Sequence, residues 1–269
     1  MRTKKAFTLL LALLAIAATA RAQNTINGHE YVDLGLPSGT LWATCNVGAN
    51  SPEDYGDYFA WGETKGYKNG KTNFSWSTYS LCNESANSLT KYCTKSSFGT
   101  VDNKTELEAE DDAAYVNWGN PWQMPSKEQQ DELRKECTYT WTQLNGVEGF
   151  KVTGTNGNFI FIPNGGYFYG TKKDGGGGYW SRSIRIEEPS VAYDLCFAGY
   201  RILEMDYISR CNGDNVRPII DRNAISDGIG FVNKETIVPK NWYSVDGVKL
   251  NGEPTKKGVY IVNGRKVVK

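Results

Sequence analysis

Short apolar segments, each closed by turn residues, constrain the fold of this chain more than any other feature of its sequence. Glycine fills every position from 175 to 178, and Asn, Gly or Pro separates most of the other segments. Short strands joined by such turns pair most readily with their neighbours in antiparallel order. The pattern therefore predicts a strand-rich second half, with strands over 138–143, 150–153, 159–163, 167–169, 179–183, 190–197 and 215–220.

The clearest helical signal comes before these strands. Ser126 and Gln129 have the spacing of a capping box, in which the hydroxyl and the amide each serve a free backbone N–H at the start of a helix. A helix is expected from 127 to about 137, and residues 111–116 predict a shorter helix or turn. Residues 48–70 and 71–110 are expected to be irregular loops. Helices early in the chain and antiparallel strands late in it predict the α+β class.

The N-terminus has the three parts of a secretory signal peptide. Arg2, Lys4 and Lys5 precede an apolar run over 7–18, and a small-x-small cleavage pattern ends at Ala22. The run is shorter than the ~20 residues that a membrane-spanning helix needs, and no cysteine lies near Ala22 to take a lipid anchor. We expect residues 1–22 to be removed on export, which leaves Gln23 as the first residue of the mature protein.

The C-terminal end reads as a linker followed by a small β structure. Residues 221–240 lack strong periodicity. Residues 241–269 contain two predicted hairpins, one turning at Asp246-Gly247 and the other at Asn263-Gly264. A segment of this size buries little core by itself. It is expected to be an appendage rather than a functional domain.

Composition excludes one class of partner and leaves two readings of the aromatic residues open. The chain has 30 basic and 30 acidic residues, and removing the basic leader makes it mildly acidic. Without a basic stripe it is not expected to bind nucleic acid. Aromatic residues make up 13% of the chain. They fit either bulky side chains in a strand-rich core or a ring-lined ligand surface. After the leader, no apolar stretch is long enough to span a membrane.

Six cysteines in an exported chain suggest disulfides, although the sequence leaves their connectivity open. Cys82 and Cys93 close a short polar loop, and Cys196 and Cys211 flank a predicted hairpin, so we expect these two pairs. Cys45 and Cys137 would form the third pair only because they are the two cysteines left over. A zinc site is not expected, because there is no CxxC motif and the chain has a single histidine.

Several segments, taken together and in order, resemble the FISUMP (major paralogous) domain of exported bacterial proteins. They lie within residues 28–220 and are 31–49 (YVDLGLPSGTLWATCNVGA), 55–63 (YGDYFAWGE), 111–114 (DDAA), 122–126 (WQMPS), 179–181 (YWS) and 215–218 (NVRP). The resemblance implies a C-type-lectin-like α+β domain related to the formylglycine-generating enzymes, with irregular loops and antiparallel strands. Residues 241–269 resemble the sorting tails of the type nine (Por) secretion route. These resemblances imply a surface destination but no single activity.

The candidate ligand-binding residues are Tyr167, Tyr169 and Tyr179, which flank the glycine run where loops meet solvent. Their rings could stack on a sugar, since one face of a pyranose is apolar and rich in C–H groups. The close cysteine pair of the formylglycine-generating enzymes has a possible counterpart in Cys196 and Cys211, for which a structural disulfide is the preferred reading.

No catalytic residue and no metal ligand is assigned from the sequence. Residues 212–215 (NGDN) offer oxygen atoms suited to calcium, but a plain turn is the preferred interpretation. The acidic residues of 106–112 are read as a solvated face. The pairs Asp54 with Asp57 and Glu187 with Glu188 lack a context that would raise a pKa for glycoside hydrolysis.

These observations lead to one favoured function and one alternative. The favoured function is an exported, non-catalytic binding or adhesion module for a glycan or a cell-surface protein. It would reach the extracellular or outer-membrane surface through secretion machinery that reads the tail, with the periplasm as the fallback location. The alternative is a divergent extracytoplasmic enzyme, either a hydrolase or a relative of the formylglycine-generating group.

Overall fold

The computed structural model describes residues 24–198 and 202–222, and in the C-terminal segment 242–244, 250, 254, 258–262 and 265–268. The chain divides into two units, Met1–Arg222 and Asn223–Lys269. The predicted signal peptide and most of the predicted linker lie outside the described residues and stay predictions. Within the described part, no helix combines the length and the apolar character that a membrane crossing requires.

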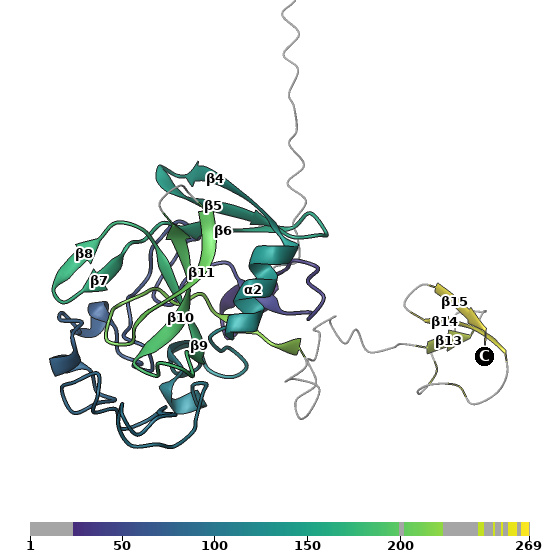
Figure 1. Cartoon of the computed structure of the whole chain (residues 1–269). Helices are drawn as coiled ribbons and strands as arrows, with labels where there is room; N and C mark the ends of the chain where they lie inside the picture. Colours follow the sequence, from purple (N-terminus) through teal and green to yellow (C-terminus); the bar gives the residue numbers. More distant parts are fainter. Residues whose placement is uncertain are drawn as a thin grey trace, which may run out of the picture. The chain divides into compact units, whose positions relative to one another are not determined.

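Four antiparallel sheets form the described part of the first unit (Figure 1). One sheet brings together the two ends of the unit, because Ile219 near the end lies opposite Trp42 near the start. Its strands, in order, are β1 (Thr25–Ile26), β2 (His29–Asp33), β3 (Leu41–Ala43) and β12 (Ile219–Ile220).

The other three sheets come from consecutive strands, as the sequence predicts. In the first of them, Asn145 and Gly146 both have positive φ, which suits a two-residue hairpin turn. The strands are β4 (Thr138–Leu144), β5 (Val147–Thr153) and β6 (Phe159–Pro163); β7 (Tyr167–Tyr169) and β8 (Lys172–Asp174); and β9 (Gly178–Ile184), β10 (Val191–Ala198) and β11 (Ile202–Ser209).

Two short α-helices accompany the sheets, and the longer one begins where its capping box predicts. In α2 (Lys127–Glu136), the Ser126 hydroxyl accepts from the N–H of Gln129 at 3.3 Å, and the Gln129 side chain accepts from the N–H of Ser126 at 2.8 Å. The helix packs against β9, β10 and β11. The other helix is α1 (Ala113–Trp118), and the 3-10 turns are η1 (Tyr67–Asn69), η2 (Trp76–Thr78) and η3 (Ala109–Asp111).

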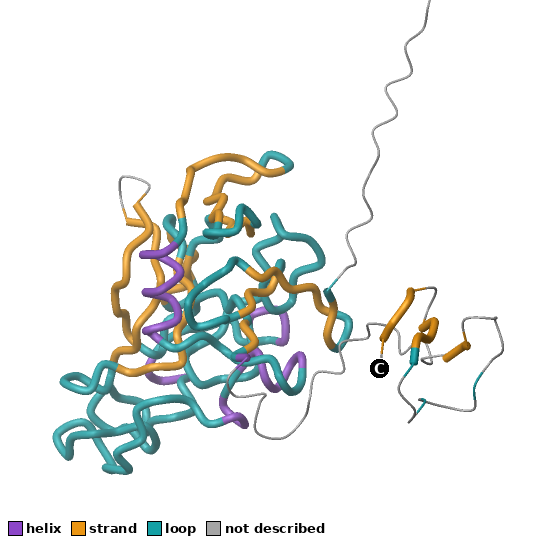
Figure 2. Tube along the Cα trace, turned by 90° about the vertical axis from the view of Figure 1, so that its right-hand side faces the viewer, coloured by secondary structure: helices purple, strands orange, loops and turns teal. Residues whose placement is uncertain are grey.

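The predicted α+β class is wrong, because the described fold is mostly β. The two α-helices contain 6 and 10 residues, and strands and loops make up most of the described chain (Figure 2). The expected helices do exist in the region of 111–137. They are too short to form a layer of their own, so they cover only part of the sheets.

Many of the aromatic side chains are buried in the core. This agrees with the interpretation that they serve as bulky side chains of a strand-rich core. Trp61, Trp122 and Trp180 are fully buried, and Trp141 packs against the main hydrophobic cluster. That cluster joins α2 to the sheets and includes Leu133, Phe150, Val152, Ile160, Tyr179, Leu195, Phe197 and Leu203. A second cluster contains Tyr58, Phe74, Tyr79, Phe168 and Cys211.

Two fully buried arginines tie the irregular segments to this core. The guanidinium of Arg210 donates to the Tyr79 hydroxyl at 2.9 Å and to the carbonyl of Pro189 at 3.0 Å, and it lies 4.6 Å from the ring centroid of Trp61. Arg217 donates to the side-chain oxygen of Asn46 at 2.7 Å and to three main-chain carbonyls. Polar partners on several sides make these buried cations tolerable.

The second unit contains a small antiparallel sheet of β13 (Trp242–Ser244), β14 (Val259–Val262) and β15 (Arg265–Val268). The pairing of β14 with β15 agrees with the hairpin predicted around Asn263-Gly264. Strand β13 pairs with β14. The turn predicted at Asp246-Gly247 lies outside the described residues.

Candidate functional site

The β7–β8 hairpin carries two of the three predicted ligand-binding tyrosines on a rigid base. Phe168, in the middle of β7, is buried between the rings of Tyr58, Tyr67 and Phe74, with centroid separations of 5.0, 4.7 and 5.3 Å. Its backbone N–H donates to the carbonyl of Gly213, and the N–H of Gly213 donates back. Successive side chains of a strand point to opposite faces. The inward direction of Phe168 therefore turns its two tyrosine neighbours outward.

Tyr169 is the most exposed large hydrophobic residue described, with 68% of its surface accessible. Tyr67, which stacks on Phe168, is 43% exposed and adds a second ring on the side of the hairpin that Phe168 occupies. Tyr167 is half-buried, and burial together with the nearby Asp174 raises its pKa. The hairpin therefore offers rings to solvent from a fixed backbone.

Tyr179, the third residue of the predicted contact surface, does not lie on it, because its side chain is buried. It is 2% exposed, its hydroxyl donates to the carbonyl of Pro163 at 2.6 Å, and it accepts from the side chain of Asn46 at 3.3 Å. The residue lies on β9 inside the main cluster, so a ligand in solvent has no access to its ring.

Lys173 fastens β8 to the loop over 48–70. Its ammonium lies 4.7 Å from the ring centroid of Tyr55 and 4.9 Å from that of Tyr58. Partial desolvation lowers the pKa of Lys173. Cation–π contacts of this kind contribute roughly 0.5–2 kcal/mol, which helps to hold the hairpin in place.

Beside the hairpin, two buried carboxylates share one face of the β9–β10 sheet. Asp194 lies opposite Trp180 in the register, and Cys196 lies opposite Gly178. A Cβ built on Gly178 would come within 2.3 Å of a carboxylate oxygen of Asp214. Opposed residues project to the same face of a sheet. The Asp214 carboxylate therefore occupies the space that a side chain at 178 would take, on the face that carries Asp194.

Neither carboxylate is satisfied in the way that buried polar groups ordinarily are. Asp214 is 0% exposed and Asp194 is 2% exposed. Both oxygens of Asp214 and Oδ1 of Asp194 have no hydrogen-bond partner. Burial, followed by the charge of Asp206, raises the pKa of Asp194 to about 8, and burial, followed by the charge of Asp194, raises that of Asp214 well above its ordinary value. Such orphaned groups are rare and call for an explanation.

Three kinds of chemistry suit a pair of this type: sharing a proton, holding a cation, or acting as a catalytic acid and base. Catalysis requires contact with substrate, and the burial of both side chains prevents that contact in this conformation. Among the described residues, no group of three or more His, Cys, Asp or Glu side chains has the arrangement of a metal site. A cation here would therefore draw its other ligands from main-chain oxygens or water.

All six cysteines are free thiols in this structure, so neither predicted disulfide is formed in it. The sulfur of Cys82 lies 3.3 Å from the carbonyl of Trp76, and that of Cys93 lies 3.1 Å from the carbonyl of Lys95. The loop between them is held by other means. The Asp102 carboxylate accepts from the N–H groups of residues 92 and 93, each at 2.8 Å.

The second predicted pair is separated by the packing of its two members. Cys196 lies on β10 opposite Gly178, whereas Cys211 belongs to the cluster of Tyr58 and Phe74. Burial raises the pKa of both thiols to about 12. A raised pKa disfavours the thiolate, which is the nucleophilic form. The two thiols therefore lack the environment of a reactive cysteine pair.

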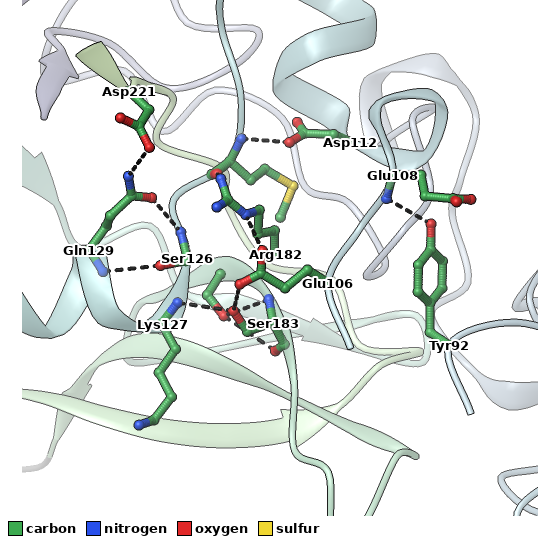
Figure 3. Close-up of polar contacts among 12 residues, drawn as sticks. Tyr92, Glu106, Glu108, Asp112, Ser126, Lys127, Gln129, Arg182, Ser183 and Asp221 are labelled. Carbon is green, nitrogen blue, oxygen red and sulfur yellow. Dashed lines mark hydrogen bonds and ion pairs between the residues drawn. The ribbon is translucent and has the colours of Figure 1, made fainter. Parts of the chain in front are cut away.

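Figure 3 shows a network of polar side chains that connects the N-terminal ends of α1 and α2 to β9. Its members form hydrogen bonds and ion pairs with one another. Arg182 pairs with Glu106 at 2.8 Å, and the Ser183 hydroxyl donates to the other carboxylate oxygen of Glu106. Asp112 caps α1 and also accepts from the N–H of Met124 at 2.7 Å. These contacts fix the fold locally and explain part of the acidic stretch over 106–112.

Two signals in the sequence could have identified more of the site. Asp194 is the one charged residue in a strand, residues 191–198 (VAYDLCFA), that otherwise has the apolar character of a buried segment. Asp214 falls in the NGDN segment that drew attention as a source of oxygen ligands. Nothing in the sequence distinguishes the exposed Tyr67 from the buried Tyr58, because both lie in the same irregular loop.

Comparison with protein-family models, with curated proteins and with solved structures finds no match for this chain.

Proposed function

We propose that this chain is an exported, non-catalytic binding module and that its contact surface is the outward side of the β7–β8 hairpin, which carries Tyr167 and Tyr169. The observation that carries the proposal is the exposure of Tyr169, 68%, on a hairpin whose central residue, Phe168, is buried among three rings. An exposed ring on a fixed backbone loses little conformational freedom when it meets a ligand.

The ligand class that this surface favours is a glycan. Tyrosine combines an apolar ring with a polar tip, which suits the C–H-rich face and the hydroxyl rim of a pyranose. The neighbouring Lys172 and Asp174 are exposed and offer hydrogen-bonding groups beside the rings. A protein ligand is the other partner in the proposal, and the same rings would serve as its anchors.

An array of defined oligosaccharides probed with the full-length mature chain, with and without calcium, tests this function. Wild type is expected to bind a subset of the glycans. Tyr169→Ala and Tyr167→Ala are each expected to weaken that binding by about tenfold, the effect of losing one ring contact. Tyr115→Ala is the matched control, because Tyr115 is an exposed ring on α1, away from the hairpin.

A parallel array of cell-surface proteins distinguishes the two ligand classes. If the chain binds only proteins, and the hairpin variants lose that binding, the ligand is a protein and not a glycan. Absence of binding on both arrays would refute the proposed function.

Export and sorting belong to the same proposal and rest on the two ends of the sequence. N-terminal sequencing of the secreted protein is expected to begin at Gln23. Deletion of 241–269 is expected to leave a folded first unit that no longer reaches the outer surface. Surface display of the truncated chain at the wild-type level would contradict a sorting function for the tail.

An enzymatic function remains the alternative, and the buried pair of Asp194 and Asp214 is the observation that favours it. Chemistry at this pair requires an opening that exposes both carboxylates. Turnover of a glycoside or ester panel that is lost in both Asp194→Asn and Asp214→Asn, in variants that remain folded, would support the alternative over the binding module.

A further inference from the structure

Two buried acidic side chains that share one face of a sheet need a compensating charge or a shared proton. A buried, unpaired carboxylate is costly because it has left its water shell, and two of them also repel each other. Among the described residues, no ion pair involves Asp194 or Asp214. The buried arginines nearest in sequence, Arg210 and Arg217, donate to carbonyls, a hydroxyl and an amide instead.

The backbone around the pair leaves room for Asp214 on that face. Residue 178 is a glycine, and any Cβ there would collide with both carboxylate oxygens of Asp214, at 2.3 and 2.7 Å. Asp214 is held from behind, because its N–H donates to the carbonyl of Phe59 and its carbonyl accepts from the N–H of Phe59. The main chain thus directs three orphaned oxygen atoms, two from Asp214 and one from Asp194, to the same buried face.

We infer that Asp194 and Asp214 bind a divalent cation that prefers oxygen ligands, with calcium as the best-suited ion. Two carboxylates neutralise the charge of such an ion, and calcium accepts mixed sets of carboxylate, carbonyl and water oxygens in flexible geometry. Cys196 lies on the same face, but its sulfur is a poor ligand for a hard cation. This inference does not depend on glycan binding by the hairpin.

Terbium is a suitable probe for the site, because it replaces calcium and its luminescence can be excited through a nearby tryptophan. Trp180 lies directly opposite Asp194 in the register and provides that antenna. The full-length chain, stripped with chelator, is expected to give terbium emission under tryptophan excitation, and calcium is expected to displace it. Calcium at ~100 times its Kd is expected to raise Tm by about 5–10 °C.

Asparagine substitutions separate a cation site from a merely buried pair. Asp214→Asn and Asp194→Asn are each expected to weaken terbium binding by at least about tenfold and to remove the calcium-dependent rise in Tm. Glu110→Gln is the matched control: it removes one carboxylate charge from the exposed η3 turn and is expected to leave both signals unchanged.

The outcome with wild type decides the inference even if a variant fails to fold. Absence of terbium emission, together with a Tm that neither calcium nor magnesium changes, would overturn it. A shared proton would then be the explanation for the pair. Terbium binding that persists in both folded Asn variants would also overturn it, because the ion would then occupy another place. Glycan binding by the hairpin can fail while this site binds its ion, so the two proposals fail separately.

Discussion

At the scale of single residues, the buried arginines have hydrogen-bond partners, whereas the two buried aspartates Asp194 and Asp214 largely lack them. Arg210 and Arg217 are fully buried, and each donates to several polar atoms of the chain. Asp194 and Asp214 are equally buried, yet three of their four oxygens accept nothing. Arginines with this many partners act as cross-links of the fold. The acidic pair is a place where the fold gives up stability, as functional sites commonly do.

The acidic pair predicts a stability that falls with rising pH when divalent cations are removed. Burial and Asp206 raise the folded pKa of Asp194 from 3.8 to about 8, so the folded state keeps a proton that the unfolded state releases. The stabilising contribution is therefore complete below pH 3.8 and is lost as the pH rises through about 8. Asp206 and Trp180 lie opposite Asp194 on the neighbouring strands, and Cys196 lies two residues further along the same strand. The Asp214 carboxylate packs against the same face at Gly178.

Tm measured in chelator at several values between pH 5 and pH 9 checks this prediction. The difference in Tm between Asp194→Asn and wild type is expected to grow in favour of the variant as the pH rises, because asparagine never ionises. A difference that stays constant over this range would show that Asp194 does not titrate in the folded protein.

At the scale of elements, local sequence signals predicted well where turn or cap chemistry fixes the backbone. The predicted strands 159–163 and 167–169 match β6 and β7, and the capping box placed the start of α2 at Lys127. Strand β8 was missed because its residues, Lys172–Asp174, are all exposed and carry no apolar pattern. The burial of Tyr179 was also missed. Its strand, β9, is buried on both faces, so alternation gives no warning.

The capping box gives a prediction at this scale. Ser126→Ala removes the acceptor for the N–H of Gln129 and is expected to lower the free energy of unfolding by about 1 kcal/mol. Ser126→Thr keeps a hydroxyl acceptor for the N–H of Gln129 and is expected to have a smaller effect. Chemical denaturation of both variants provides the comparison. A larger loss for Ser126→Thr than for Ser126→Ala would contradict the predicted contribution of the cap.

At the scale of the whole molecule, hydrogen bonds and packing replace the disulfide framework that the cysteine count suggested. Six cysteines in a chain that is expected to be exported favour disulfides. Spacing along the sequence cannot show that Asp102 and Arg210 already hold the loop over 71–110. The fold class was misjudged for a related reason, since clear helix signals say where a helix starts but not how large a share of the fold it will form.

A thiol count tests this picture of the molecule. The unfolded protein, without reductant, is expected to show six reactive thiols, and the native protein is expected to react slowly at the buried Cys137 and Cys211 and at the half-buried Cys196. Burial raises the pKa of these three thiols, to about 11 for Cys137 and about 12 for the others. Peptide mapping that finds Cys82 linked to Cys93, or Cys196 to Cys211, would restore the disulfide prediction.

The function proposed for the whole chain depends on the hairpin that presents Tyr169. The most direct measurement is calorimetric titration of the full-length mature chain with the oligosaccharide that it binds best on the array. The predicted result is a Kd about tenfold weaker for Tyr169→Ala than for wild type and unchanged for Tyr115→Ala. Equal affinities for wild type and Tyr169→Ala would contradict the claim that this hairpin is the binding surface.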